Sequence, residues 1–133
     1  MMYSDTFLKL ILATLAGGFI GLEREVVHKP AGIRTHMLVS LGSALFILIS
    51  NDLLPDETAR IIAGIATGIG FLGAGTIFKA KSDVHGLTTA ASIWTVAGVG
   101  IAIGLGYYFI TFVSVVLILA ILQLNKIEFF KKL

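Results

Sequence analysis

The sequence of 133 residues contains no cysteine, only two prolines and few charged residues. Without cysteine the protein has no disulfide bonds, no thiolate metal ligands and no thiol nucleophile. Charged residues make up 14% of the chain and hydrophobic residues 56%, whereas soluble domains carry about 25% charged residues. The composition therefore excludes a soluble domain, and the length predicts one all-α membrane domain over residues 1–133.

The net charge of +2 does not indicate a nucleic-acid partner. Lys and Arg stand at the ends of apolar segments instead of clustering along one amphipathic stretch, and in that position they set the orientation of membrane helices. The partner that the composition predicts is the lipid bilayer.

Apolar segments indicate five transmembrane helices. They cover residues 6–22, 31–51, 60–78, 87–105 and 107–125. Each is close to the 17–25 residues, roughly, that cross a hydrocarbon core. The sequence thus predicts a five-helix bundle, with the first segment retained as a helix and not removed as a signal peptide.

Basic residues predict the orientation of this bundle. Eight of the ten Lys and Arg residues would share one side of the membrane, namely Arg24, Lys29, Arg34, Lys79, Lys81, Lys126, Lys131 and Lys132. Positively charged loops are retained in the cytoplasm. We therefore expect the N-terminus outside and the C-terminus inside, in the cytoplasm.

Fifteen glycines in so apolar a chain indicate close helix packing. Small residues at four-residue steps let membrane helices approach closely. The glycines of interest are Gly17, Gly21, Gly64, Gly68, Gly70, Gly73 and Gly75. Their spacing predicts that helices 6–22, 60–78 and 87–105 form the centre, with 107–125 peripheral. A second interpretation is that the third helix breaks near residues 70–75 and lines a transport pathway.

The first polar cluster follows the first apolar segment. It consists of Glu23, Arg24, Glu25, Arg34, Thr35 and His36. These charges either anchor helix ends at the membrane surface or form a functional site in which Glu23 pairs with Arg34 across the first helical hairpin. The sequence leaves both interpretations open.

The second polar cluster surrounds the start of the fourth helix. Its members are Asp83, His85, Thr88, Thr89, Ser92 and Trp94. The hydroxyls are typical of helix starts and interhelical hydrogen bonds. Alternatively, Asp83 and the acids of the first cluster hold Mg²⁺, although no pair has ligand spacing within one helix. No cofactor is expected, and a metal site remains open.

No ionisable residue lies near the middle of any predicted span. Ion carriers normally place such groups, or a filter of carbonyl oxygens, at that depth. A nucleophile–base arrangement is also missing, so we expect no enzymatic activity.

Four motifs in order carry a resemblance over essentially the whole chain. They are Gly21-Leu-Glu-Arg-Glu25, Ala31-Gly-Ile-Arg-Thr-His36, Thr67-Gly-Ile-Gly-Phe-Leu-Gly-Ala-Gly75, and Gly86-Leu-Thr-Thr-Ala-Ala91 with Ile93-Trp94. Together they resemble the transmembrane domain of the MgtC/SapB family of bacterial inner-membrane proteins.

The resemblance implies a role in growth under magnesium limitation and in survival inside host cells. It also implies that some members restrain other membrane machines, including the F-type ATP synthase. Two departures bear on these roles. Longer relatives carry a cytoplasmic domain after the last helix, whereas this sequence ends at Leu133. The Thr88 position is Asn in some relatives, and cysteines found in some are absent.

These observations predict a small membrane regulator or interaction protein. We expect it to form a homodimer and to bind another membrane protein complex. The alternative is a transporter or channel for Mg²⁺ or protons, with a broken third helix.

Overall fold

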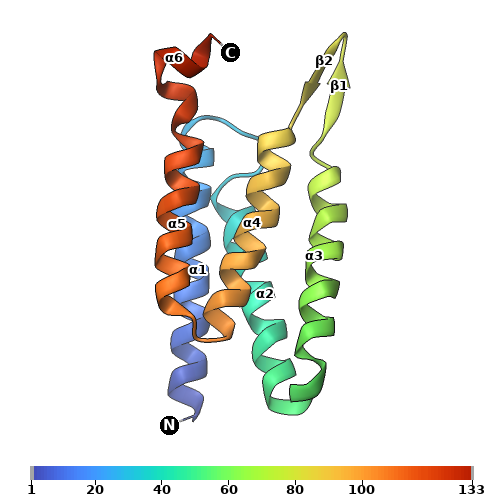
Figure 1. Ribbon diagram of the computed structural model, residues 1–133, viewed down its shortest axis with the longest axis vertical. Coiled ribbons are helices and arrows are strands. Elements are labelled where there is room, and N and C mark those ends of the chain that lie inside the picture. The colour runs from blue at the N-terminus through green and yellow to red at the C-terminus, as the bar shows by residue number, and fades with distance from the viewer. Residues whose placement is uncertain (1, 133) are drawn as a thin grey trace.

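A computed structural model describes residues 2–132 as an elongated helical bundle (Figure 1). Its longer helices are α1 (Met2–Val26), α2 (Ile33–Leu53), α3 (Thr58–Ala74), α4 (Leu87–Gly104) and α5 (Tyr108–Leu122). Short helices η1 (Pro55–Glu57), η2 (Leu124–Lys126) and α6 (Glu128–Lys131) connect or follow them. The predicted helices are present, with ends shifted by up to four residues.

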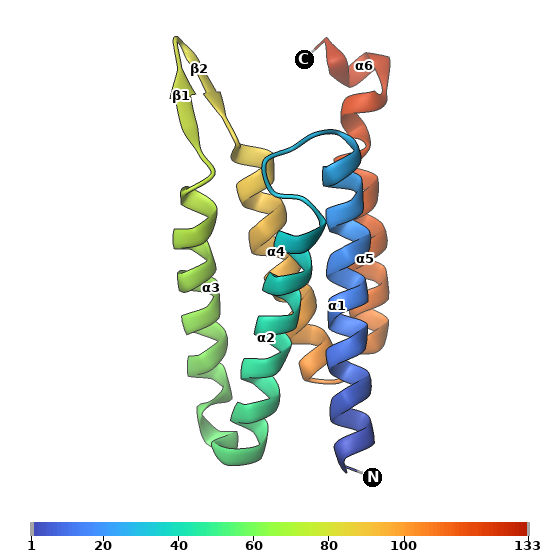
Figure 2. The same cartoon turned by 180° about the vertical axis from the view of Figure 1, so that it is seen from behind.

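Successive long helices run in alternating directions, so the two termini lie at opposite ends of the bundle (Figures 1 and 2). One end carries the α1–α2 loop, α6 and a β-hairpin between α3 and α4. We refer to it as the hairpin end. The opposite end carries the N-terminus and η1.

Four helical stretches are long and apolar enough to cross a membrane. They are Tyr3–Val26, Ile33–Leu53, Leu87–Gly104 and Tyr108–Lys126. This result confirms the prediction of a helical membrane protein. Helix α3 corresponds to the predicted span 60–78 and is not among these four, because it is shorter, with 17 residues.

The close-packed centre consists of α1, α2 and α4, with α2 in the middle. A Cβ atom at Gly17 of α1 would clash with the backbone of α2 at His36, and one at Gly100 of α4 would clash with the backbone of α2 at Ser40. Gly21 and Gly104 make similar contacts with α2. The prediction that the third helix belongs to this centre is wrong. Glycine spacing identifies a helix face suited to close approach, but it does not identify the helix that packs there. The glycine faces of α1 and α4 both pack against α2, a helix poor in glycine.

Helix α3 packs at the side of this centre and is continuous. Gly64, Gly68 and Gly70 lie within it, and a Cβ atom at any of them would meet nothing within 4 Å. Only Gly73 among its helical glycines approaches α4, at Ala90. The second interpretation, a helix broken near residues 70–75, is therefore wrong within α3, which runs without interruption to Ala74. In an apolar environment an unpaired backbone group costs more than the weak helix propensity of glycine.

A β-hairpin replaces the predicted end of the third helix. The Thr76 hydroxyl donates to the carbonyl oxygen of Gly73 at 2.7 Å, and the Thr76 backbone N–H donates to the same oxygen at 2.9 Å, so Thr76 caps the end of the helix. Strands β1 (Phe78–Ala80) and β2 (Asp83–His85) then pair antiparallel, with Lys79 opposite Val84. The predicted helical range 60–78 and the strictly all-α class are corrected accordingly.

Gly86 joins the hairpin to α4 in a left-handed conformation, with φ +89°. A Cβ atom there would also clash with the carbonyl oxygen of Thr76. We expect Gly86→Ala to destabilise the fold by about 2–3 kcal/mol, because it combines backbone strain with a backbone clash. Thermal unfolding in detergent would measure the loss. Gly70→Ala, at a helical position with open space, is the control and should change little.

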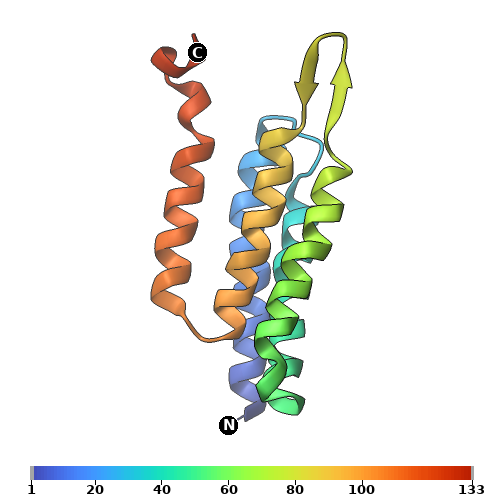
Figure 3. The ribbon, with the colours of Figure 1, turned by 45° about the vertical axis from the view of Figure 1, so that its right-hand side comes forward.

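Helix α5 is peripheral, as predicted. Only Thr111 and Leu122 are buried along its length, and it stands apart from α3 on the other side of α4 (Figure 3). Its exposed Phe, Leu, Ile and Val side chains suit contact with lipid.

Candidate functional site

A buried polar cluster lies where three helices meet at the hairpin end. Glu23 and Arg24 come from the last turns of α1, His36 from the first turn of α2, and Thr89 and Ser92 from the first turns of α4. All five are buried. We refer to them as the hairpin-end cluster.

Glu23 and Arg24 form a buried ion pair although they are neighbours in sequence. The Arg24 Nε donates to Glu23 Oε2 at 2.6 Å, and Nη2 donates to Oε1 at 3.2 Å. Arg24 is 3% exposed and Glu23 9%. Arg24 Nη1 is buried and has no hydrogen-bond partner among the described residues. The two charges neutralise each other at a depth where either alone would be costly.

His36 links the start of α2 to α4. Its Cβ lies against Gly21 of α1, where a larger residue would push the imidazole away. The ring Nδ1 is 2.8 Å from the carbonyl oxygen of Gly32, and Nε2 is 2.9 Å from the Ser92 hydroxyl oxygen. A carbonyl oxygen only accepts, so Nδ1 carries a hydrogen and donates it.

The Ser92 hydroxyl has two acceptors in reach and only one hydrogen. Its oxygen is also 2.8 Å from the carbonyl oxygen of Thr89. When His36 is neutral, Ser92 donates to Nε2. When His36 is protonated, Nε2 donates to Ser92, which then donates to Thr89. The cluster can therefore hold one proton, with the Ser92 hydroxyl turning between two partners.

We expect Ser92→Ala to destabilise the protein by about 1–3 kcal/mol, since it leaves the buried Nε2 of His36 without a partner. Helix unfolding followed by circular dichroism during denaturant titration would measure it. Thr95→Ala is the matched control: it removes a hydroxyl that bonds only to carbonyls of its own helix. Equal losses in the two variants would show that the His36–Ser92 hydrogen bond contributes nothing.

The other predicted site residues lie outside the cluster. Glu25 accepts a hydrogen bond from the backbone N–H of Ile33 at 2.8 Å and so caps the start of α2. Arg34 is exposed and the described structure gives it no ion pair with Glu23, so the predicted Glu23–Arg34 pair is wrong. The neighbouring Arg24 satisfies Glu23 instead. Of the remaining candidates, Thr35 is half-buried, and Asp83, Thr88 and Trp94 are exposed.

The structure does not gather the proposed magnesium ligands. Within residues 2–132, no three His, Asp or Glu side chains are grouped so that they could hold one metal ion. Asp83 lies on the exposed hairpin, where His85 stacks on Phe78 with ring centroids 5.3 Å apart.

Sequence reasoning placed Ser92 in a polar cluster but did not select it as a site residue, and it missed Ser40. The Ser40 hydroxyl is buried where α1, α2 and α4 come closest and has no partner among the described residues. The available signal was a buried face on α2 with alternating steps of four and three. This face comprises His36, Ser40, Ser43, Ile47 and Ser50.

Beyond the cluster the buried face of the centre carries no charge: the serines of α2 alternate there with fully buried apolar side chains. Ile20, Ile47, Val96 and Ile103 are at most 1% exposed. Helix α4 has no ionisable residue, and α2 has none between His36 and Asp52. The polar groups of the hairpin end therefore do not continue as a charged path through the bundle.

Comparison with known proteins identifies a family match over most of the chain. The family model described as "MgtC family" matches residues 10–128. "Putative magnesium transporter YhiD" of Escherichia coli is 40% identical over 131 residues, which cover 92% of this chain and 61% of that protein. "Protein MgtC" of Salmonella typhimurium is 46% identical over 108 residues, covering 81% of this chain and 47% of that protein.

An uncharacterized Haemophilus influenzae protein is 37% identical over 132 residues, covering 91% of this chain and 56% of its own length. The chain thus spans about half to three-fifths of the curated relatives it matches. No solved structure shows a significant match.

Proposed function

Because this chain belongs to the MgtC family, we propose that it is a bacterial inner-membrane regulator linked to magnesium homeostasis. It acts by binding other membrane proteins and not by carrying ions. The observation that carries this proposal is a centre without charged groups: the buried ionisable residues of the described chain, Glu23, Arg24 and His36, lie at the hairpin end, and only apolar residues and serines are buried beyond them in α2 and α4. Ion transport would need ionisable groups, or a carbonyl-lined filter, at that depth.

A flux measurement tests this proposal. The purified protein is reconstituted in liposomes that contain Mg²⁺- and pH-sensitive dyes. We expect no flux above that of protein-free liposomes, with an ionophore as the positive control. In parallel, the tagged protein is isolated from cells grown in low magnesium, and we expect a membrane protein complex to co-purify. Robust Mg²⁺ or proton flux that Arg34→Ala abolishes would overturn the regulator role.

Transport remains the second candidate because one relative carries the name of a magnesium transporter. In that case the hairpin-end cluster would act as a cytoplasmic gate. The two candidates make opposite predictions in the liposome measurement.

The same proposal includes five membrane spans, with the N-terminus outside and the C-terminus in the cytoplasm. The alternating directions of α1 to α5 support it, since α3 lies beside helices that are long enough to cross (Figure 1). Because the chain has no cysteine, single cysteines report the topology cleanly. An impermeant maleimide added to intact cells should label Asp56→Cys and leave Ser82→Cys unlabelled; the reverse pattern contradicts this orientation.

A further inference from the structure

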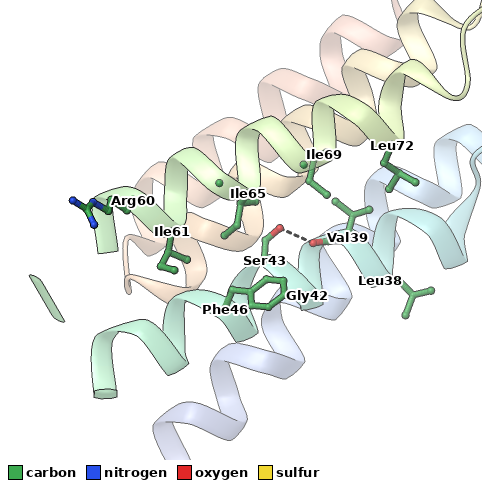
Figure 4. Close-up of a pocket in the computed structure, with 12 residues that line it drawn as sticks. Leu38, Val39, Gly42, Ser43, Phe46, Arg60, Ile61, Ile65, Ile69 and Leu72 are labelled. Atoms are coloured by element: carbon green, nitrogen blue, oxygen red, sulfur yellow. Dashed lines mark hydrogen bonds between the residues drawn. The ribbon is translucent and has the colours of Figure 1, made fainter. Parts of the chain in front are cut away.

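An apolar groove runs between α2 and α3 on the outside of the bundle (Figure 4). It encloses about 580 Å³. Apolar side chains from both helices line it, together with Gly42 of α2 and with Gly64 and Gly68 of α3. Arg60 lies at its end near η1.

The three glycines of this groove have no role inside the chain. A Cβ atom at Gly42, Gly64 or Gly68 would meet nothing within 4 Å, whereas one at Gly17 or Gly100 would strike backbone. Glycine is a poor helix former, and packing within the chain does not explain why these three positions are glycine. A Gly-x-x-x-Gly pair allows another helix to approach closely. A lipid acyl chain is flexible and does not need paired glycines in order to fit against a helix.

The charges at the end of the groove are self-complementary. Glu57 and Arg60 are 3.2 Å apart, with Arg60 largely exposed and Glu57 half-buried. At 100° per residue, positions 60, 64 and 68 of α3 fall on one face, and Glu57, at the end of η1, contacts Arg60 at the end of that face. Two copies of a membrane protein inserted in the same direction meet about an axis along the membrane normal, so each residue lies near its own counterpart. The two Arg60 side chains then approach each other, and the Glu57 three positions away in each copy can offset their repulsion by pairing with the Arg60 of the other copy.

We propose that a second copy of this chain occupies the groove. The two α3 helices cross at Gly64 and Gly68, and each lies in the α2–α3 groove of the other copy. Glu57 of one copy pairs with Arg60 of the other at the edge of the membrane. The inference deepens the proposed function, because it names the partner and the face of the homodimer, and it rests on α3 crossing the membrane.

Single cysteines test the crossing point. In membranes treated with a permeant oxidant, Gly64→Cys and Gly68→Cys should form disulfide-linked dimers. Gly70→Cys is the matched control: it is also an open glycine of α3 but does not line the groove. Gly64→Leu should weaken the dimer by roughly tenfold or more, because a side chain at a tight contact overpacks it. Gly70→Leu should leave dimerisation unchanged, and unchanged helical content in both confirms folding.

A charge exchange tests the pairing between copies. Arg60→Glu and Glu57→Arg are expressed together with different tags. Arg60→Glu carries acidic residues at both positions and Glu57→Arg carries basic residues at both, so neither variant forms the ion pair within its own chain. A dimer of one copy of each variant places opposite charges on the two chains. We expect the mixed dimer to exceed each homodimer by roughly tenfold, because like charges that face each other are disfavoured.

Several results would overturn the proposal: a monomer in membranes, equal cross-linking at Gly70→Cys, no preference for the mixed dimer, or a groove occupied by phospholipid or a different protein. These results are independent of the flux measurement. A monomeric protein without ion flux would contradict only the proposed dimer interface. A cross-linked dimer that transports Mg²⁺ would contradict only the proposed regulator role.

Discussion

Gly100→Ala is expected to be the most damaging single-methyl substitution in the centre. The added Cβ would clash with the carbonyl oxygen of Ser40, which belongs to the backbone of α2 and cannot rotate away. Helices α2 and α4 must separate to accommodate it. Since α2 is held against α1 at Gly17 on its other side, the displacement spreads to both interfaces. Overpacking costs about 1–3 kcal/mol and sometimes more, and we expect a loss at or above the upper end.

The measurement is the free energy of unfolding in mixed micelles, followed by circular dichroism. Gly98→Ala is the control, because it lies on the same helix two residues away and a Cβ atom there meets nothing within 4 Å. It should leave stability unchanged. A small loss for Gly100→Ala, similar to that for Gly98→Ala, would mean that α2 and α4 are not in close contact.

Breaking the Glu23–Arg24 pair is the second change with a large expected effect. Glu23→Ala leaves the guanidinium of Arg24 buried without a counter-charge, and Arg24→Ala leaves the carboxylate in the same state. Removal of one partner from a buried pair costs about 3–5 kcal/mol. Removal of both leaves no unpaired charge. The double variant Glu23→Ala/Arg24→Ala should therefore be more stable than either single variant.

Unfolding of the four proteins gives a double-mutant cycle. Asp5→Asn is a suitable control, because it breaks the Lys9–Asp5 ion pair, in which the aspartate is exposed. Exposed pairs contribute about 0–1 kcal/mol. Additive losses in the cycle would contradict a direct interaction between Glu23 and Arg24.

The sequence predicts the helices well because a helix that crosses the bilayer needs a minimum number of apolar residues, and that number can be read directly along the sequence. It predicts the ends less well. The hairpin was missed because Phe78–Ala80 and Asp83–His85 are three residues each, too short for an alternating pattern. Ile77 and Phe78 extend the apolar segment of the third helix, so hydropathy alone continues that helix through Phe78.

Contacts between helices depend on which faces meet, and the sequence does not encode that locally. The spacing of Gly17 and Gly21 reveals a tight face, but not that α2 lies on it. In the same way, opposite charges suggested Glu23 with Arg34, whereas the folded chain places Arg24 against Glu23 and turns Arg34 outward. The bond between His36 and Ser92 joins residues 56 positions apart, and a serine hydroxyl at a helix start gives no sign of so distant a partner.

The order of helices in the chain has a consequence for biosynthesis. The close-packed centre consists of α1, α2 and α4. Since α3 precedes α4 in the chain, it is synthesised before the last helix of the centre, although it does not belong to that centre. At about 5–20 residues per second, the ribosome needs several seconds to travel the 56 residues from His36 to Ser92. Once α1 and α2 have entered the bilayer, the face of α2 that will contact Gly100 stays uncovered until α4 follows. The nascent protein is most exposed to contacts with wrong helices during that stage.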